Sequence, residues 1–293
     1  MSDFWTQYPE GLAGKRTRLG RVVNPDTGRG VVATIAHGAF LGPLAGEPEG
    51  ANTASFIRSL GDAGADTVLI TPGTLVRAVA GFVGRGAPGS MLVLDWTNEF
   101  RDRETRFGFS EGRHSLMASV QDALNLGADS VLTYLFIGRD DPRAEAEQVE
   151  YNGRVSRECE RLGMVRAIET MTRGSRVGDR RLSVDLIRVH TRLAAEIGAD
   201  IIKCEWTGDV DSFRQVVKSC PVPIFVAGGP SSGGPRAALE IAHGSMQAGA
   251  MGLVFGRNVV QAPSPTRMAA ALAGIVHQGW SVDRAAQALE GDA

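Results

Sequence analysis

One lysine stands in an apolar run where a charged side chain is unexpected. The stretch "ADIIKCEWTGD", residues 199–209, is typical of a short buried strand, yet it carries Lys203 directly after two isoleucines. The chain holds 31 lysines and arginines, of which only three are lysines, at positions 15, 203 and 218. Because side chains alternate along a strand, we expect Ile201, Lys203 and Glu205 on one face. Ile202 and Cys204 then occupy the face that packs under helices.

A lysine on an inner face can serve as a nucleophile. Burial disfavours the ammonium form, and a neutral amine can attack a carbonyl carbon to form a Schiff base. The alternative is structural, because Lys203 could form an ion pair with Glu205 or Glu169 and simply close the mouth of the fold. Its position and rarity alone leave both interpretations open.

Other side chains suited to proton transfer lie near the ends of further β-rich runs. An imidazole exchanges protons readily near neutral pH, so His37 is a candidate acid or base, although a lone histidine at a strand end can also be structural. The remaining candidates of this kind are Asp95, Tyr134, Glu169 and Glu205.

Two glycine-bearing turns follow the last two β-rich runs and predict a phosphate site. They are "AGGPSSGG" (227–234), with Gly228 and Gly229, and "GRN" (256–258), with Gly256 and Arg257. Glycine lets backbone N–H groups approach phosphate oxygens, the start of a following helix favours anions, and an arginine can add a bidentate contact. Two ordinary turns are the alternative, since one pair of glycines is a weak signal.

Composition excludes several classes of function. The net charge of −2 gives no basic field for nucleic acid, and no run of apolar residues is long enough to span a membrane. There is no HxH, HExxH or cysteine cluster, so we expect neither a metal site nor a cofactor. The first twenty residues contain no signal peptide, and three cysteines fit free thiols, so we expect a cytoplasmic protein.

Short β-rich runs alternate with longer helical patterns, which predicts βαβ units and parallel pairing. Eight such runs occur, at residues 31–38, 66–73, 91–96, 129–138, 164–170, 200–206, 223–229 and 251–256. Gly-Ala-Asp recurs at 64–66, 127–129 and 198–200, and Gly-Ala at 249–250, each between a helical pattern and an even-numbered run. We therefore predict an α/β fold, a (β/α)8 TIM barrel over residues 31–293, with an N-terminal extension at 1–30. An open doubly wound sheet is the rival, but no G-x-G-x-x-G follows the first run.

Four segments carry a resemblance to a known family: "NPDTGRGVVATIAHG", "GADIIKCEWTGD", "CPVPIFVAGGP" and "GRNVVQ". Through them the chain resembles the archaeal-type class I aldolases, the group that includes fructose-bisphosphate aldolase, aminodideoxyheptulosonate synthase and the phosphorylated autoinducer-2 thiolase. The similarity runs from about Leu19 to His277. The family's Schiff-base motif is matched at Ile202-Lys203 and at 207–209, so the resemblance implies that Lys203 is the Schiff-base lysine. It also implies phosphate binding at Gly228-Gly229 and Gly256-Arg257.

The sequence departs from the family pattern at two proton-transfer positions. The Asp-His-Gly of the family's first strand reads Ala36-His37-Gly38 here, and the family's catalytic tyrosine on strand four is matched by Phe136. We therefore expect proton transfer to move to His37, Glu205 or Asp95. Tyr134 shares the face of Phe136 but lies deeper in the strand.

The resemblance predicts a Schiff-base lyase or transferase acting on a phosphorylated ketose or keto substrate, and the two departures argue against fructose 1,6-bisphosphate. Two alternatives remain: thiolase-like acyl transfer to coenzyme A with His37 as base, and an isomerase, dehydratase or non-catalytic relative. The family also implies a homo-oligomer, often of ten subunits.

Overall fold

The computed structural model describes residues 13–48, 50, 52–101, 107–109, 112–229 and 233–291. At its centre is a closed barrel of parallel strands in the order β1-β2-β3-β6-β7-β8-β9-β10, and β10 pairs back with β1. The predicted (β/α)8 barrel is confirmed, and each predicted β-rich run overlaps one barrel strand, although β1, β3 and β7 extend beyond their runs by one or two residues. These strands are β1 (Gly30–Thr34), β2 (Thr67–Ile70), β3 (Gly89–Val93), β6 (Ser130–Ile137), β7 (Val165–Thr172), β8 (Ile201–Cys204), β9 (Ile224–Ala227) and β10 (Gly252–Phe255).

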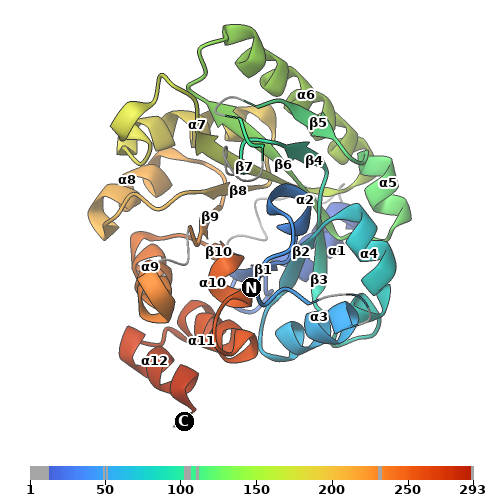
Figure 1. Ribbon diagram of the computed structural model, residues 1–293, viewed down its shortest axis with the longest axis vertical. Coiled ribbons are helices and arrows are strands. Elements are labelled where there is room, and N and C mark those ends of the chain that lie inside the picture. The colour runs from blue at the N-terminus through green and yellow to red at the C-terminus, as the bar shows by residue number, and fades with distance from the viewer. Residues whose placement is uncertain are drawn as a thin grey trace.

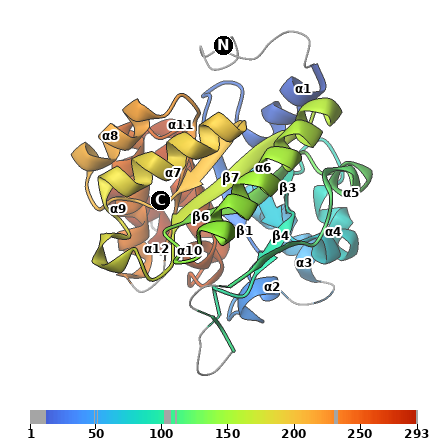
Figure 2. The ribbon, with the colours of Figure 1, turned by 90° about the horizontal axis from the view of Figure 1, so that it is seen from above.

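Helices surround the barrel, as Figure 1 shows. Figure 2 shows the longest of them, α6, lying along the outside of β6 and β7. A two-stranded antiparallel sheet of β4 (Asp95–Thr97) and β5 (His114–Leu116) is inserted after β3. The helices are α1 (Ala13–Val22), α2 (Gly38–Leu41), α3 (Asn52–Asp62), α4 (Pro72–Ala78), α5 (Val120–Asn125), α6 (Pro142–Leu162), α7 (Val184–Ile197), α8 (Val210–Ser219), α9 (Gly234–Ala248), α10 (Arg257–Val260), α11 (Pro265–Gln278) and α12 (Val282–Glu290), with 3-10 turns η2 (Val79–Phe82) and η3 (Gly178–Arg180). In the part of the chain that is described, none of these helices is long and apolar enough to cross a bilayer.

The extension expected at residues 1–30 contains α1, which covers the amino-terminal end of the barrel. Leu19 and Val22 on α1 are fully buried and belong to the same apolar cluster as the inward-facing residues of the strands. The backbone oxygen of Val22 lies so close to Gly30 that a side chain there would collide with it. The opposite, carboxyl-terminal end of the barrel is therefore the one left open for a site.

The repeated Gly-Ala-Asp has a structural explanation. Each of its glycines adopts a left-handed conformation, with φ of 100° at Gly64, 78° at Gly127 and 102° at Gly198, which ends the preceding helix or turn. The aspartate carboxylate then accepts a hydrogen bond from a backbone N–H of the preceding barrel strand. The three bonds are Val31 to Asp66 at 2.7 Å, Ser90 to Asp129 at 2.8 Å and Arg166 to Asp200 at 2.8 Å. These bonds fix the register of neighbouring strands at the amino-terminal end of the barrel.

Side chains on β8 alternate as the sequence predicted. Ile201 packs in the inner cluster of the barrel, and Lys203 and Glu205 line a cavity at its open end. Ile202 packs outside the sheet with Ala194 of α7, and Cys204 belongs to the outer helical core. The strand therefore turns the unusual lysine inward.

One histidine outside the barrel is buried without a partner. His190 on α7 has no exposed surface, and neither ring nitrogen has a hydrogen-bond partner within the described residues. Burial lowers the pKa of His190 from 6.5 to about 3, because the charged imidazolium would lose its hydration. The native state therefore keeps this ring neutral through mildly acidic pH.

We expect His190→Leu to reduce the sensitivity of the protein to acid. Below pH 6.5 the unfolded chain gains a proton at His190 that the folded state does not bind until about pH 3, so stability falls as pH decreases across this window. At pH 5 this term amounts to roughly 2 kcal/mol. The difference in unfolding free energy between pH 7 and pH 5, measured by urea denaturation, should shrink by about that amount in the variant. An unchanged difference would contradict a neutral buried His190.

Candidate active site

A cavity of about 760 Å³ lies at the carboxyl ends of the barrel strands. It collects side chains from β1, β6, β7, β8 and the turns after β9 and β10, which are far apart in sequence. Nine of the ten residues predicted from the sequence line it: His37, Tyr134, Glu169, Lys203, Glu205, Gly228, Gly229, Gly256 and Arg257. The tenth, Asp95, does not. Residues 230–232 of the predicted glycine loop lie outside the described residues.

Three of these side chains form a row across adjacent strands. Tyr134 of β6 pairs with Glu169 of β7, and Glu169 pairs with Lys203 of β8. Paired residues on neighbouring strands project from the same face of a sheet, so all three point into the barrel at one level. The register of β6, β7 and β8 therefore decides which groups surround the lysine.

Lys203 and Glu169 form an ion pair at the floor of the cavity. The Lys203 Nζ donates a hydrogen bond of 2.8 Å to Glu169 Oε2, and the two residues are only 8% and 3% exposed. Of the two structural partners that the sequence left open for Lys203, Glu169 is the one bound. A carboxylate at this distance can also accept a proton directly from the ammonium group, which would leave a neutral amine.

Tyr134 supplies a phenol to the cavity, whereas Phe136 does not line it. Burial, reinforced by the nearby charges of Glu169 and Asp95, raises the pKa of Tyr134 well above its usual value, so its hydroxyl stays protonated. The ring of Phe136 is fully buried and packs edge-on against Phe100. The cavity thus keeps a phenol, one layer deeper than the position that matches the family's tyrosine.

Asp95 is directed away from the cavity, into the contact between β4, β6 and α6. Its buried carboxylate accepts hydrogen bonds from the Tyr134 backbone N–H at 3.0 Å and from the Tyr151 hydroxyl. His114 lies 3.5 Å away on β5. The suggestion that Asp95 moves protons at the site therefore receives no support from the geometry, which fits a role in positioning β6.

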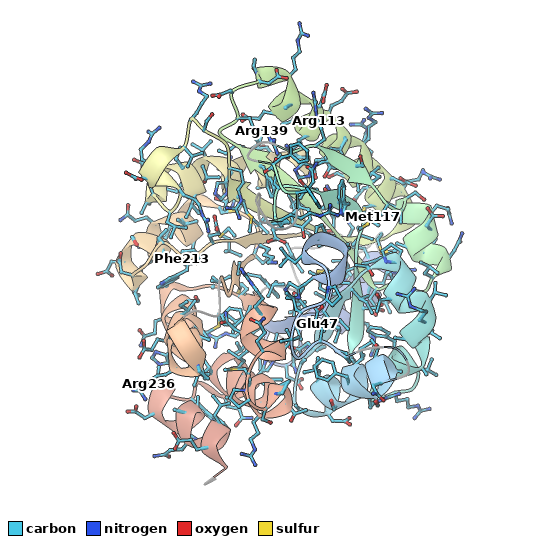
Figure 3. All side chains as sticks on the ribbon, in the orientation of Figure 1. Glu47, Arg113, Met117, Arg139, Phe213 and Arg236 are labelled. Atoms are coloured by element: carbon cyan, nitrogen blue, oxygen red, sulfur yellow. The ribbon has the colours of Figure 1, made fainter. Side chains whose placement is uncertain are left out.

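His37 is held by a carboxylate that the sequence analysis did not identify. Its Nδ1 lies 2.6 Å from Glu47 Oε1, and both side chains are mostly buried. Figure 3 shows Glu47 close to the middle of the molecule, in the segment that follows α2. Because a carboxylate only accepts, Nδ1 carries the hydrogen and Nε2 is the nitrogen available to a ligand.

Glu205 is fixed by a second unpredicted residue, Arg181. The guanidinium of Arg181, in the segment between β7 and α7, binds Glu205 Oε1, while Oε2 is buried and has no hydrogen-bond partner in the described part of the chain. Arg173, at the end of β7, also lines the cavity. Both arginines belong to the arginine-rich run "TRGSRVGDRR" (172–181), a signal that sequence reading could have used.

Glycine is required at two of the predicted phosphate-binding positions by close packing. A Cβ on Gly228 would lie 2.7 Å from the Asn258 amide nitrogen, which donates a hydrogen bond of 2.6 Å to the Gly228 carbonyl. A Cβ on Gly256 would lie 2.4 Å from His37 Nε2. The turns after β9 and β10 are therefore joined to each other and to His37, beside the guanidinium of Arg257.

The described residues contain no group of three or more His, Cys, Asp or Glu placed to hold a metal ion. Cys159, Cys204 and Cys220 are free, and burial raises the pKa of the Cys159 thiol to about 12. These thiols are therefore poor nucleophiles at neutral pH, and the amine of Lys203 is the nucleophile that the cavity offers.

Comparison with known proteins identifies the family of the chain. Residues 33–262 match the model of the DeoC/LacD family aldolases. The chain belongs to this family. It is 30% identical over 279 residues to an uncharacterised aldolase of Saccharolobus solfataricus, covering 95% of this chain and all of that protein. It is 32% identical to the 2-amino-3,7-dideoxy-D-threo-hept-6-ulosonate synthase of Halobacterium salinarum, covering 90% and 92% of the two chains.

The barrel also matches a solved structure of an archaeal fructose 1,6-bisphosphate aldolase. The TM-score is 0.76 at 26% identity, over 90% of this chain and 99% of the other. Family and fold together identify the protein as a class I aldolase-type enzyme of the DeoC/LacD family. Its substrate is a separate question, because the residues around Lys203 differ from the family pattern.

We expect Asp95→Asn to affect stability far more than chemistry. The amide can still accept from the Tyr134 backbone, but it loses the charged acceptor for the buried Tyr151 hydroxyl, at a cost of about 2 kcal/mol. Urea denaturation of Asp95→Asn and Tyr151→Phe should show destabilisation in both, with Lys203 still reactive toward a ketone. A stable Asp95→Asn protein that has lost its activity would instead place Asp95 in the chemistry.

Proposed function

We propose that the protein is a carbon–carbon lyase or transferase in which Lys203 forms a Schiff base with a phosphorylated ketose or keto substrate. One observation carries the proposal: the Lys203 amine lies inside the cavity and donates a hydrogen bond of 2.8 Å to Glu169. The phenol of Tyr134 lies beyond Glu169, on β6. A lysine placed only to close the barrel would not need a cavity of about 760 Å³ above it. The family assignment supports the same class of reaction.

Formation of the Schiff base begins with a proton transfer from the Lys203 ammonium to Glu169. The neutral amine adds to the ketone carbon, and the carbonyl oxygen leaves as water, which gives a protonated imine on Lys203. Tyr134 remains protonated because of its raised pKa, so it can donate a hydrogen bond to the departing oxygen. The imine nitrogen then acts as the electron sink.

Cleavage of the adjacent C–C bond requires a base. The bond's electron pair moves toward the imine nitrogen and leaves an enamine, while a hydroxyl proton leaves the other fragment, which departs as an aldehyde. We assign this proton to Glu205, two residues beyond Lys203 on the same face, with Oε1 anchored by Arg181. Glu205 then returns this proton to the enamine carbon, and hydrolysis of the imine restores the lysine.

The phosphate of the substrate is assigned to the turns after β9 and β10. Gly228, Gly229 and Gly256 present backbone without side chains to the cavity, and Arg257 lies beside them. Burial and the neighbouring Arg181 lower the pKa of Arg257, and no carboxylate among the described residues forms an ion pair with this guanidinium. A phosphoryl group would supply an anionic partner.

A second candidate, acyl transfer to a thiol such as coenzyme A, is favoured by the His37–Glu47 pair. A histidine held by a carboxylate is the arrangement expected of a general base that deprotonates a thiol. Dependence of product formation on coenzyme A, lost in His37→Asn, would select this candidate over the lyase.

Borohydride reduction in the presence of dihydroxyacetone phosphate should attach the reduced ketose to Lys203. We expect intact mass to show one adduct, peptide mapping to place it at residue 203, and Lys203→Met to abolish it. Lys218→Met is the matched control, because this lysine lies on α8, away from the cavity, and its loss should leave the adduct unchanged. Failure to trap any phosphorylated ketone on Lys203 would remove the Schiff-base mechanism.

Glu205→Gln should separate imine formation from proton transfer. We expect the adduct on Lys203 to persist, while deuterium uptake from D₂O at the carbon next to the imine falls roughly 10²–10⁴-fold, the usual contribution of a general base. His37→Asn serves as comparison and should change this exchange less than about tenfold. Loss of exchange in His37→Asn but not in Glu205→Gln would transfer the role to His37.

A further inference from the structure

Among the described residues on the β7 side of the cavity, the guanidinium of Arg173 has no carboxylate partner, whereas that of Arg181 has one. Three of the cavity's carboxylates have a cation each: Glu169 binds Lys203, Glu205 binds Arg181, and Glu99 binds Arg139. Arg173 also lines the cavity, yet no carboxylate among the described residues lies within 4.0 Å of its guanidinium. Within the described residues, Arg173 is therefore a cation that forms no ion pair.

The immediate surroundings of Arg173 are poor in acceptors. Its Nη2 donates to the thioether sulfur of Met171 at 3.2 Å, a weak acceptor, and its Nε has no hydrogen-bond partner within the described residues. The guanidinium lies 5.7 Å from the ring centre of Phe100 and 5.9 Å from that of Phe136. Burial, together with Arg181, lowers the pKa of Arg173, although Glu205 acts in the opposite direction.

The barrel order separates Arg173 from the predicted phosphate turns. Lys203 on β8 stands between β7, which ends next to Arg173, and β9 and β10, which lead into Gly228 and Arg257. A substrate whose carbonyl reacts with Lys203 and whose phosphate lies at Arg257 therefore extends its other end toward β7. That end meets the ring of Phe100 and the guanidinium of Arg173, which both line the cavity.

We propose that Arg173 binds a carboxylate at the end of the substrate remote from its phosphate. This inference rests on the proposed function, which it narrows to substrates with a phosphate at one end and a carboxylate at the other. A single planar guanidinium matches the single charge and two coplanar oxygens of a carboxylate. A second phosphate is the rival ligand at this position, because Gly174 and Ser175 also line the cavity beside Arg173.

The test compares two ligands that differ only in this group and contain no ketone to react with Lys203. Isothermal titration of the full chain with 6-phosphogluconate and with glucitol 6-phosphate should give at least tenfold tighter binding of the carboxylate, as expected of roughly one charge-assisted hydrogen-bonded pair. In Arg173→Gln the two affinities should become equal. Arg257→Gln should weaken both ligands, and Arg154→Gln, on the exposed surface of α6, should change neither.

Three results would overturn the carboxylate subsite: equal affinities in the wild type, a preference that survives in Arg173→Gln, or tighter binding of glucitol 1,6-bisphosphate than of 6-phosphogluconate. The last would indicate a second phosphate at Arg173. Because neither probe forms an imine, the outcome is independent of borohydride trapping. If 6-phosphogluconate binds more tightly but no ketone is trapped on Lys203, only the Schiff-base mechanism is overturned. If a ketone is trapped on Lys203 but the two ligands bind equally, only the carboxylate subsite is overturned.

Discussion

The ion pair between Lys203 and Glu169 is the constraint around which the cavity is arranged. Removing an ammonium and a carboxylate from water costs several kcal/mol per ion, which is offset only when the two are well placed and hydrogen-bonded. The register of β7 and β8 meets this condition by pairing the two residues directly. The same register places Tyr134 beside Glu169, where the carboxylate helps to keep the phenol protonated. One alignment of three strands thus places both neighbours of the amine and keeps the phenol protonated.

A comparison within the chain shows why burial alone does not make a lysine reactive. Lys15 is even less exposed than Lys203, but it lies at the amino-terminal end of the barrel between Glu160 and Asp200. Burial tends to lower its pKa, yet these two carboxylates raise it above the usual value. Lys15 does not line the cavity at the carboxyl ends of the strands. Lys203 differs by having one carboxylate partner and open space above it.

Two arginines fix the orientation of other carboxylates at the cavity. Arg181 and Arg139 each fix a carboxylate, and Figure 3 places Arg139 near Arg113, at the side where β5 meets α6. A guanidinium holds a carboxylate in a defined plane, so Glu205 and Glu99 are oriented and not merely neutralised. Arg181 therefore positions the carboxylate of Glu205, which we propose as the base, and Arg139 positions that of Glu99.

Much of this architecture could be predicted from the sequence, because strand alternation and helix caps depend on residues close together in the chain. The eight strands, the inward lysine and the Gly-Ala-Asp turns follow from such local rules, as do the nine cavity residues at strand ends. Asp95 shows where these rules stop: it lies near the end of a predicted run, but in the structure it begins β4, and the contact with α6 directs its carboxylate to Tyr151.

The sequence by itself determined the barrel and the inward-facing lysine, since periodicity and motif spacing are properties of contiguous residues. Only the tertiary structure decided which carboxylate holds each cation. Glu47 meets His37 across a loop, Arg181 reaches Glu205 from the preceding β7–α7 segment, and Arg173 pairs with no carboxylate among the described residues. Charge pairing depends on distance in space, which no local pattern records.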